Sequence, residues 1–355
     1  MNKVMSRNTS AWLLLVGGSL RTLSLFVALV VQVSAAEPPK MKAVVAHEYG
    51  GPEVLKLEEM PRPEPNEDQA LVKVIASGVN PADPLTLSGK YAREFGTHLP
   101  LIPGYDIAGV VEKIGSKVTK LKVGEAVYGY PTFGGGWAEY VTVHEGEVAA
   151  KPKSLSFIEA AAVPMGALTA WQALVDVADV KPGQKVLVHG ASGGVGSFAV
   201  QIAKIRGARV IGTASTLNQD LLRQLGVDQP IDYTTTKFEE TTPDVDVVLD
   251  PVGKQTLARS YGVVKPGGII MSLVARPDPS ELKKRGIRGA GISVHADAED
   301  LAEIGRLIDD GKIKPVVTKV LPLSESIDAQ RQAATHHTRG KVVIRVADDP
   351  VGAGQ

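Results

Sequence analysis

The sequence predicts an α/β protein in two parts, a β-rich region followed by a parallel sheet covered by helices. Three observations lead to this fold class. Short runs of branched residues, divided by Gly and Pro, fill the stretch from 42 to 143. Runs typical of strands and of helices then alternate from residue 185 onward. A glycine-rich turn at 190–196 joins the first of these later strands to a helix.

The β-rich region comes first in the chain. Its expected strands are residues 42–47, 70–76, 107–114 and 138–143. Residues 61–65, which include three prolines, provide a turn-prone connection between the first two strands. Further Gly and Pro residues separate the later strands, so this region is predicted to contain many turns.

The second part begins with helices. Ser156 and Glu159 stand three residues apart before an apolar run, which predicts a capping box at a helix start. Apolar residues then recur at three- and four-residue spacing across 167–178, which predicts a second helix. Beyond it we expect strands at 185–189, 208–213, 245–249 and 268–274 and helices at 195–206, 217–225, 254–263 and 299–310. Residues 315–321 and 341–346 are predicted strands that rejoin the first domain, and 348–355 are expected to be a disordered tail.

The composition excludes several functions. The 39 basic and 39 acidic residues balance, so there is no electrostatic reason to expect nucleic acid as a partner. The chain has no cysteine, which rules out disulfides, thiolate zinc sites and thiol nucleophiles. None of the 7 histidines forms the i, i+4 pair of a helical zinc site, so we expect no metal.

The first forty residues differ from the rest. A basic start, an apolar stretch and small residues at 34–36 are typical of a secretory signal peptide over residues 1–36. The protein is then expected to be exported, periplasmic or secreted, with no stable membrane span after the signal is removed. Two alternatives stay open. One is an uncleaved membrane anchor, for which Arg21 would be costly, and the other is translation from Met41, which would leave the protein cytoplasmic.

The turn at 190–196 is the strongest local signal for function. It follows a strand and opens a helix, a setting in which glycines let the backbone approach a pyrophosphate and the helix N-terminus favours its charge. The alternative is a tight turn with no ligand. The next strand ends in Ser215 and Thr216 rather than in the acid that would bind the ribose of NAD, which favours NADP. Arg223 is either a charge for the 2′-phosphate or a solvated helical arginine.

Several further motifs occur in one order along the chain. They are Gly78-Val-Asn80-Pro81-Ala-Asp83, Pro103-Gly-Tyr-Asp-Ile-Ala-Gly109, Gly136-Trp-Ala-Glu-Tyr140, Leu168-Thr-Ala-Trp171 and Arg339-Gly-Lys341. Together with the glycine-rich turn, they resemble the zinc-free quinone oxidoreductase-like branch of the medium-chain dehydrogenase/reductase superfamily. The resemblance runs from Met41 to about Val346. Zinc-dependent relatives carry a cysteine at the position of Asn80 and a His-Glu pair near Tyr105 and Asp106, and neither occurs here.

The resemblance implies a fold and an activity. The fold would be a GroES-like β domain, split in sequence over 41–160 and 312–347, around a Rossmann domain over 161–311, and many members are homodimers. The activity would be a zinc-independent, NADPH-dependent transfer of hydride to a quinone or an α,β-unsaturated carbonyl. Two alternatives stay open: a zinc-free alcohol or carbonyl dehydrogenase, and a non-catalytic NADP-binding protein of the same fold.

The resemblance also implies site residues. Asn80 would lie beside the nicotinamide and donate to the substrate oxygen, the alternative being an Asx-type turn before Pro81. Tyr91 would be a phenolic proton donor or a packing residue, because Leu85 stands where some relatives place a tyrosine. The other residues expected to bind the cofactor are Thr169, Ser192, Gly193, Gly194, Val195, Gly196, Ser215, Tyr233, Val252, Leu273 and Lys341. Leu217 replaces a lysine that NADP-using relatives often carry, which weakens the NADP preference.

Two further residues have two interpretations each. Asp83 either orients its neighbours or accepts hydrogen bonds from backbone amides. Tyr233 is either a ribose contact or a half-buried strand tyrosine. In the expected mechanism, Asn80 stabilises charge on the carbonyl oxygen, and a proton arrives from water or Tyr91, without a metal or a covalent nucleophile.

Overall fold

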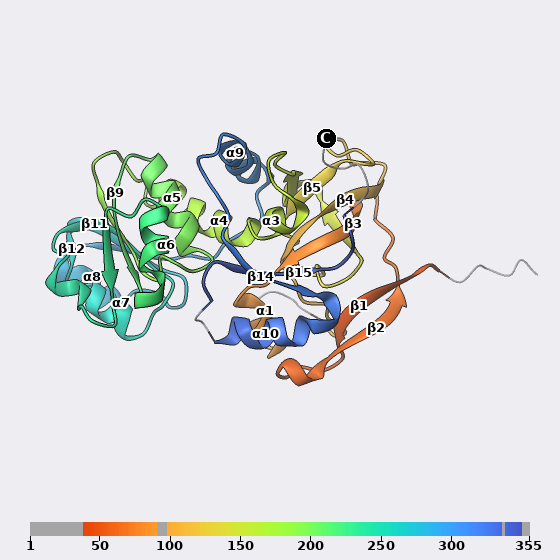
Figure 1. The fold of residues 1–355 in the computed structure, drawn as a ribbon, viewed down its shortest axis with the longest axis horizontal. Coiled ribbons are helices and arrows are strands. Elements are labelled where there is room, and N and C mark those ends of the chain that lie inside the picture. The colour runs from red at the N-terminus through yellow and green to blue at the C-terminus, as the bar shows by residue number, and fades with distance from the viewer. Residues whose placement is uncertain (1–37, 91–97, 336–337, 350–355) are drawn as a thin grey trace, which may run out of the picture. The chain divides into compact units, whose positions relative to one another are not determined.

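A computed structural model describes residues 38–90, 98–335 and 338–349 of the chain, and Figure 1 draws its ribbon. The expected signal at 1–36, the expected role of Tyr91 and most of the expected tail therefore lie outside the described residues. Within the described ranges, no helix has the length and apolar character needed to cross a membrane.

The β-rich region forms a seven-stranded sheet and a separate antiparallel pair. The seven-stranded sheet has the order β14-β15-β3-β4-β5-β7, and β6 also pairs with β3. Its strands are β3 Gln69–Gly78, β4 Asp106–Ile114, β5 Ala126–Gly129, β6 Tyr140–His144, β7 Val148–Ala150, β14 Val317–Pro322 and β15 Lys341–Arg345, and the pair is β1 Lys40–Ala46 with β2 Leu55–Pro61. All four strands predicted in this region are present. The strands β2, β5 and β7 were not predicted, because they are short or half-exposed and lack a clear apolar run.

The C-terminal strands lie in the same sheet as β3. The strand β15 runs antiparallel to β3 and pairs Val343 with Gly78, while β14 runs parallel to β15. Figure 1 shows these two strands, in blue, beside the orange β3. The amide of Val79 donates to the carbonyl of Val342 at 2.9 Å, so the register continues past the strand end and sets Lys341 opposite Asn80.

The second sheet is parallel throughout. Its six strands have the order β10-β9-β8-β11-β12-β13. They are β8 Lys185–Val188, β9 Arg209–Ala214, β10 Gln229–Asp232, β11 Val245–Asp250, β12 Val264–Ser272 and β13 Arg288–Gly291. The order runs outward in both directions from β8 and β11, which makes a doubly wound sheet of the Rossmann type. In such sheets ligands bind at the carboxyl ends of the strands beside this switch point.

Helices connect and cover the sheets. They are α1 Ala82–Leu87, α3 Phe157–Ala161, α4 Pro164–Trp171, α5 Gly196–Ile205, α6 Gln219–Gln224, α7 Gln255–Ser260, α8 Pro279–Arg285, α9 Ala298–Asp309 and α10 Ser326–Ala334. The predicted capping box is present, because Ser156 Oγ accepts from the Glu159 amide at 3.2 Å and Glu159 Oε2 accepts from the Ser156 amide at 2.9 Å. The helix predicted at 167–178 is α4 followed by a π-helical turn, Gln172–Val177.

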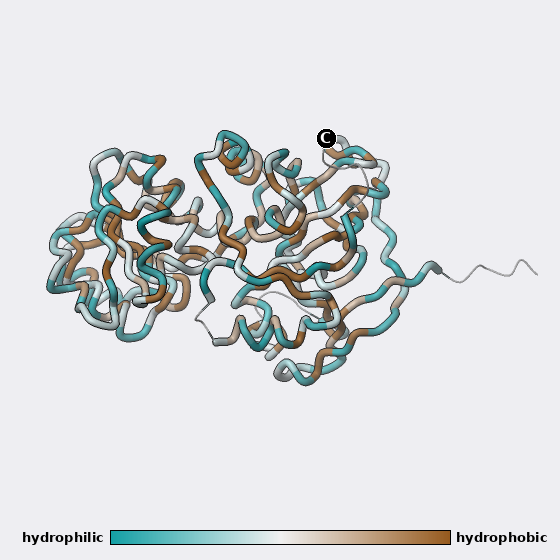
Figure 2. Tube along the Cα trace, viewed as in Figure 1, coloured by the Kyte–Doolittle hydropathy of each residue, from teal (hydrophilic) through white to brown (hydrophobic). Residues whose placement is uncertain are grey.

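One hydrophobic core connects the two parts of the protein. It includes residues of β3 and β4, the helices α3 and α4, and the strands and helix around β8 and α5. Figure 1 shows α4 in the middle, and Figure 2 shows apolar chain, in brown, along the interior strands and polar chain, in teal, on outer turns. This shared core fixes the Rossmann sheet against the β-rich region, so residues of both parts are held together at one site.

Candidate active site

The glycine-rich turn leads from β8 into α5 and leaves backbone amides exposed at the helix start. Gly190 has a φ of 54°, and a Cβ on Gly196 would lie only 2.2 Å from the carbonyl oxygen of Gly190, so the turn needs glycine at both places. Among the described residues, none accepts a hydrogen bond from the amides of Gly194 or Val195. Amides at the N-terminus of a ten-residue helix suit the pyrophosphate of a dinucleotide.

The turn is joined directly to the β-rich region. The amide of Gly340 donates to the carbonyl of Ser192 at 2.7 Å, and Gly193 and Gly340 form an isolated β-bridge. A Cβ on Gly194 would lie 3.0 Å from Cδ of Lys341, so this lysine packs against the turn. Four of the predicted cofactor residues, Ser192, Gly193, Gly194 and Lys341, therefore lie next to one another.

Beside the turn, Asn80, Asp106 and Lys341 form a buried polar cluster. Lys341 Nζ donates to Asp106 Oδ2 at 2.7 Å and also to Asn80 Oδ1, while Asn80 Nδ2 donates to Asp106 Oδ2 at 2.9 Å. The residues are 3% (Asn80), 0% (Asp106) and 4% (Lys341) exposed. Since its side chain is bonded to these two residues, Asn80 does not form the Asx-type turn that was the alternative.

Two carboxylates at the cluster, Asp106 and Asp83, also accept hydrogen bonds from backbone amides. Asp106 Oδ1 accepts from the amide of Met165 at 2.6 Å, at the start of α4. Asp83 accepts from the amides of Asn80 at 2.7 Å and Gly104 at 2.9 Å, so it satisfies backbone amides. Burial, with a smaller contribution from the charge of Asp106, raises the pKa of Asp83 to about 7, although the two amides and Lys341 oppose the shift.

Asp106 is a site residue that the sequence analysis did not assign to the cofactor or the substrate. Its signals in the sequence were its place in the motif Pro103–Gly109 and its position just before the predicted strand 107–114, and neither assigns it a role in the site. A buried charge needs partners. Those partners come from three distant parts of the chain, so no local pattern could identify them.

Thr169, Val252 and Leu273 also lie near this end of the Rossmann sheet. Thr169 is buried on α4 and donates to the carbonyl of Met165 at 2.6 Å. Val252 and Leu273 follow β11 and β12, and their amides donate to the side chain and the carbonyl of Asp250 at 2.9 and 3.1 Å. The carboxyl ends of these strands lie beside that of β8, which leads into the glycine-rich turn.

Ser215 and Tyr233 follow the two strands on the other side of β8. Ser215 comes directly after β9, and Tyr233 comes directly after β10. Tyr233 lies outside the strand and is 51% exposed, so it is not the strand tyrosine that was the alternative. Arg223 pairs with Asp220 at 2.8 Å on the exposed face of α6, as a solvated helical arginine does.

His189 is a second buried residue that the sequence analysis did not single out. Ser260 Oγ donates to the carbonyl of Thr256 at 2.7 Å, so it must accept from His189 Nε2 at 2.9 Å. Nδ1 then accepts from Thr213 Oγ1 at 3.1 Å. Burial, aided by Arg259 and opposed by Glu239, lowers the pKa of His189 to about 3, so a neutral imidazole holds the base of the glycine-rich turn.

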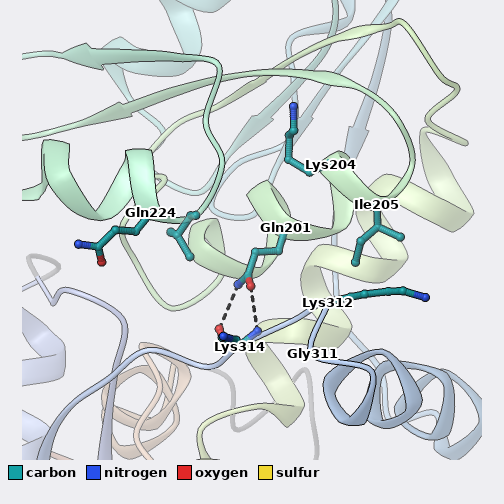
Figure 3. A pocket seen from close by; sticks show the side chains of 8 residues that line it. Gln201, Lys204, Ile205, Gln224, Gly311, Lys312 and Lys314 are labelled. Atoms are coloured by element: carbon teal, nitrogen blue, oxygen red, sulfur yellow. Dashed lines mark hydrogen bonds between the residues drawn. The ribbon is translucent and has the colours of Figure 1, made fainter.

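A cavity of about 430 Å³ lies on the far side of α5, between α5, α6 and the segment 311–314. Figure 3 shows Gln201 bonded through both amide atoms to the backbone of Lys314. Lys204, Lys312 and Gln224 extend away from one another in this view, and Lys204 is paired with Asp228 at 2.8 Å. The cavity therefore lacks converging polar groups, and we do not assign it to the chemistry.

A second cavity, of about 500 Å³, lies in the β-rich part of the protein. Its lining includes Tyr105, which precedes Asp106 in the chain, and Thr86, whose Oγ1 lies 2.7 Å from the hydroxyl of Tyr105. The remaining lining residues are mostly apolar: His98, Pro100, Leu101, Ile102, Pro103, Phe133 and Gly135. A mostly apolar cavity with a few hydroxyl groups suits a small organic molecule. In the described ranges, no three His, Asp or Glu side chains are grouped as metal ligands would be.

Comparisons with known proteins agree with this geometry. Residues 66–153 match the alcohol dehydrogenase GroES-like domain, and residues 225–344 match the zinc-binding dehydrogenase family. The chain is 40% identical to a 2-methylene-furan-3-one reductase of Solanum lycopersicum, over 88% of this chain and 83% of that one. It is 38% identical to a chloroplastic NADPH-dependent alkenal/one oxidoreductase of Arabidopsis thaliana, over 88% and 82%. The solved quinone oxidoreductase of Coxiella burnetii superposes with a TM-score of 0.81 at 35% identity, over 87% of this chain and 100% of that one.

Proposed function

Since the chain belongs to the quinone oxidoreductase-like branch of the medium-chain dehydrogenase/reductase superfamily, and is thus an oxidoreductase, we propose that it reduces quinones or α,β-unsaturated carbonyls with NADPH and without zinc. The observation that carries this proposal is the buried cluster of Asn80, Asp106 and Lys341. It lies against the glycine-rich turn, and Tyr105, the residue before Asp106 in the chain, lines an apolar cavity. We propose that the cofactor and the substrate meet at the Asn80 amide.

The residues present fit a dinucleotide. The unpaired amides of Gly194 and Val195 would hold the pyrophosphate, and Thr169, Val252 and Leu273 would line the groove. Ser215 offers a neutral hydroxyl group where an acid would select NAD, which supports NADP, while the hydroxyl of Thr216 donates to Asp232 at 2.6 Å. When bound, NADPH supplies the hydride.

The chain's own residues would then stabilise charge on the acceptor oxygen. An amide has two N–H groups, and within the described ranges the contacts of Asn80 use one of them, so we assign the other to that oxygen. A donor that is fixed before the reaction stabilises developing charge without reorganisation. The apolar walls of the 500 Å³ cavity suit the flat carbon skeleton of an enone or a quinone.

The charge of the cluster supports a site without zinc. Lys341 is 4% exposed, and its ammonium contacts both Asp106 and Asn80. The carboxylate there is already neutralised by this cation, so a divalent metal next to it would meet strong repulsion.

The test is the consumption of NADPH with an alkyl vinyl ketone, with a benzoquinone and with the matching saturated ketone. We expect turnover of the first two and none of the third, and Asn80→Ala should lower kcat by about 100-fold. Turnover of the saturated ketone would instead support a carbonyl dehydrogenase. Saturable NADPH binding without turnover of any acceptor would support a non-catalytic binding protein.

We also propose that residues 1–36 are a cleaved export signal and that the mature chain is a homodimer. The first proposal rests on the basic, apolar and small-residue pattern, and the second on family membership. The mass of the mature N-terminus tests the first, because a start at Glu37 supports export and a start at Met41 contradicts it. Light scattering of the purified protein tests the second.

A further inference from the structure

The orientation of the Asn80 amide is fixed by the chemistry of its two neighbours. A lysine ammonium has only donors, so the atom that faces Lys341 Nζ must be the amide oxygen. The Asp106 carboxylate has only acceptors, so the atom 2.9 Å from its Oδ2 must be the amide nitrogen. A flipped amide would set N–H against the ammonium and oxygen against the carboxylate, which would lose both bonds.

Asp106 is itself held in place from several sides. Its Oδ1 accepts from the Met165 amide at 2.6 Å, and its backbone carbonyl accepts from Ser77 Oγ at 2.7 Å. A Cβ on Gly78 would lie 2.7 Å from Asp106 Oδ2 and 2.4 Å from the carbonyl of Ala161, so only glycine at this position lets the backbone approach the carboxylate this closely. A fully buried and fully bonded carboxylate is a rigid support for the group bonded to it.

We propose that Asp106, together with Lys341, is a positioning residue that aims the remaining N–H of Asn80 at the acceptor oxygen. The inference rests on the proposed function, because it concerns how the Asn80 N–H donor is oriented in that reaction. Asp106 does not touch the acceptor. It acts through Asn80, and the ammonium of Lys341 on the amide oxygen also polarises the amide and strengthens its N–H as a donor.

The first test replaces Asp106 by asparagine. Asp106→Asn keeps the size of the side chain but removes its charge and sets an amide nitrogen against at least one of the three N–H donors of this site, so the Asn80 amide loses its rigid, charged support. We expect kcat to fall by about 100-fold, with the KM of the acceptor and the dissociation constant of NADPH changed by less than about threefold.

Asp246→Asn is the matched control. Asp246 is also a buried aspartate that pairs with a lysine, Lys265, and accepts one backbone amide, that of Lys185 at 2.8 Å. It lies in β11, away from the cluster. We expect this variant to lose stability while its kcat stays within about twofold of the wild type.

A double-mutant cycle separates positioning from a general structural effect. If Asp106 acts through Asn80, the variant Asn80→Ala with Asp106→Asn should have the same kcat as Asn80→Ala alone. If the two losses multiply, Asp106 acts independently of Asn80 and the inference is overturned.

A measurement without turnover keeps the inference testable if Asp106→Asn does not fold. The ¹⁵N–¹H signals of the Asn80 side chain, assigned by their loss in Asn80→Ala, should show two separate protons, one of them slow to exchange with solvent. Averaged or rapidly exchanging signals in the wild type would overturn the inference. If the wild type reduces enones but Asp106→Asn does so equally well, the proposed function stands and the inference fails.

Discussion

His189 links the pH of the solution to the stability of the fold. Its pKa is lowered from 6.5 to about 3 by burial, so between these values the unfolded chain binds a proton that the folded protein does not. Stability is therefore complete above pH 6.5 and is lost as the pH falls toward 3. From pH 7 to pH 5 this residue alone should lower the free energy of unfolding by about 2 kcal/mol.

His189→Gln tests this prediction. Glutamine can accept from Thr213 and donate to Ser260, as the imidazole does, but it does not titrate. Urea unfolding at several pH values should show a smaller loss of stability in the variant below pH 6.5. Asp83, whose raised pKa acts in the opposite direction, contributes equally to both proteins and cancels. Parallel curves would contradict a neutral buried imidazole.

Leu217 stands where a lysine would be expected to strengthen the preference for NADPH over NADH. Its side chain is 88% exposed and follows Ser215 and Thr216, beside which the ribose 2′-phosphate would lie. Leu217→Lys would add a charge-assisted bond to that phosphate, so we expect the dissociation constant of NADPH to fall by about tenfold. Fluorescence titration measures it, with Leu217→Met as the control. An equal increase in affinity for NADH would mean that the lysine does not bind the 2′-phosphate.

The roles of some site residues could be predicted from the sequence, and the roles of others could not. The glycines of 190–196 stand in a short motif whose chemistry is local, so they could be identified from their neighbours in the chain, while the role of Asn80 came from the family resemblance alone. Asp106 could not, because its partner Lys341 is 235 positions away. The roles of buried polar groups depend on contacts that only the folded chain creates.

Among the elements, α10 carries an unusual buried amide. Gln330 is fully buried, and neither atom of its side-chain amide has a hydrogen-bond partner among the residues that the structure describes. Its helix packs Ala329 and Ala333 into an apolar cluster with Trp137. An unpaired buried polar group costs roughly 1–3 kcal/mol. Gln330→Met, which keeps the length and removes the amide, should therefore stabilise the protein by about 1 kcal/mol or more.

Urea unfolding of Gln330→Met measures this gain. Gln332→Met on the same helix is the control, since Gln332 is only half-buried and should change stability by less than about 0.5 kcal/mol. A destabilised Gln330→Met would show that an internal water holds the amide in solution.

The elements that the sequence predicted share strong apolar periodicity. The strands β3, β4, β8, β9 and β11 and the helices α5 and α9 all lie close to their expected bounds. The polar α10 and the edge strand β13 have weak patterns and were not predicted. The change to a π-helical turn at 172 was also invisible, because α- and π-helical turns place apolar residues at similar spacing.

At the scale of the whole molecule, the site exists because β15 pairs with β3. The sequence indicated a strand at 341–346, but not its register, since register depends on pairing between segments far apart. A shift of one residue would turn Lys341 to the other face of the sheet and away from Asn80. The pairing of Gly340 with Ser192 then ties this strand to the glycine-rich turn.

The pairing of β15 with β3 also leads to a prediction about chelators. The ammonium of Lys341 enters the cluster with β15 and pairs with Asp106 at 2.7 Å, so the charge of this carboxylate is already neutralised and a divalent metal beside it would meet repulsion. Prolonged treatment with EDTA should leave NADPH-dependent turnover of an enone unchanged, and metal analysis of the active protein should find far less than one zinc per chain. Added Zn²⁺ should give no gain. Loss of turnover on chelation, with recovery on adding Zn²⁺, would place a metal in the reaction and contradict the role given to Lys341.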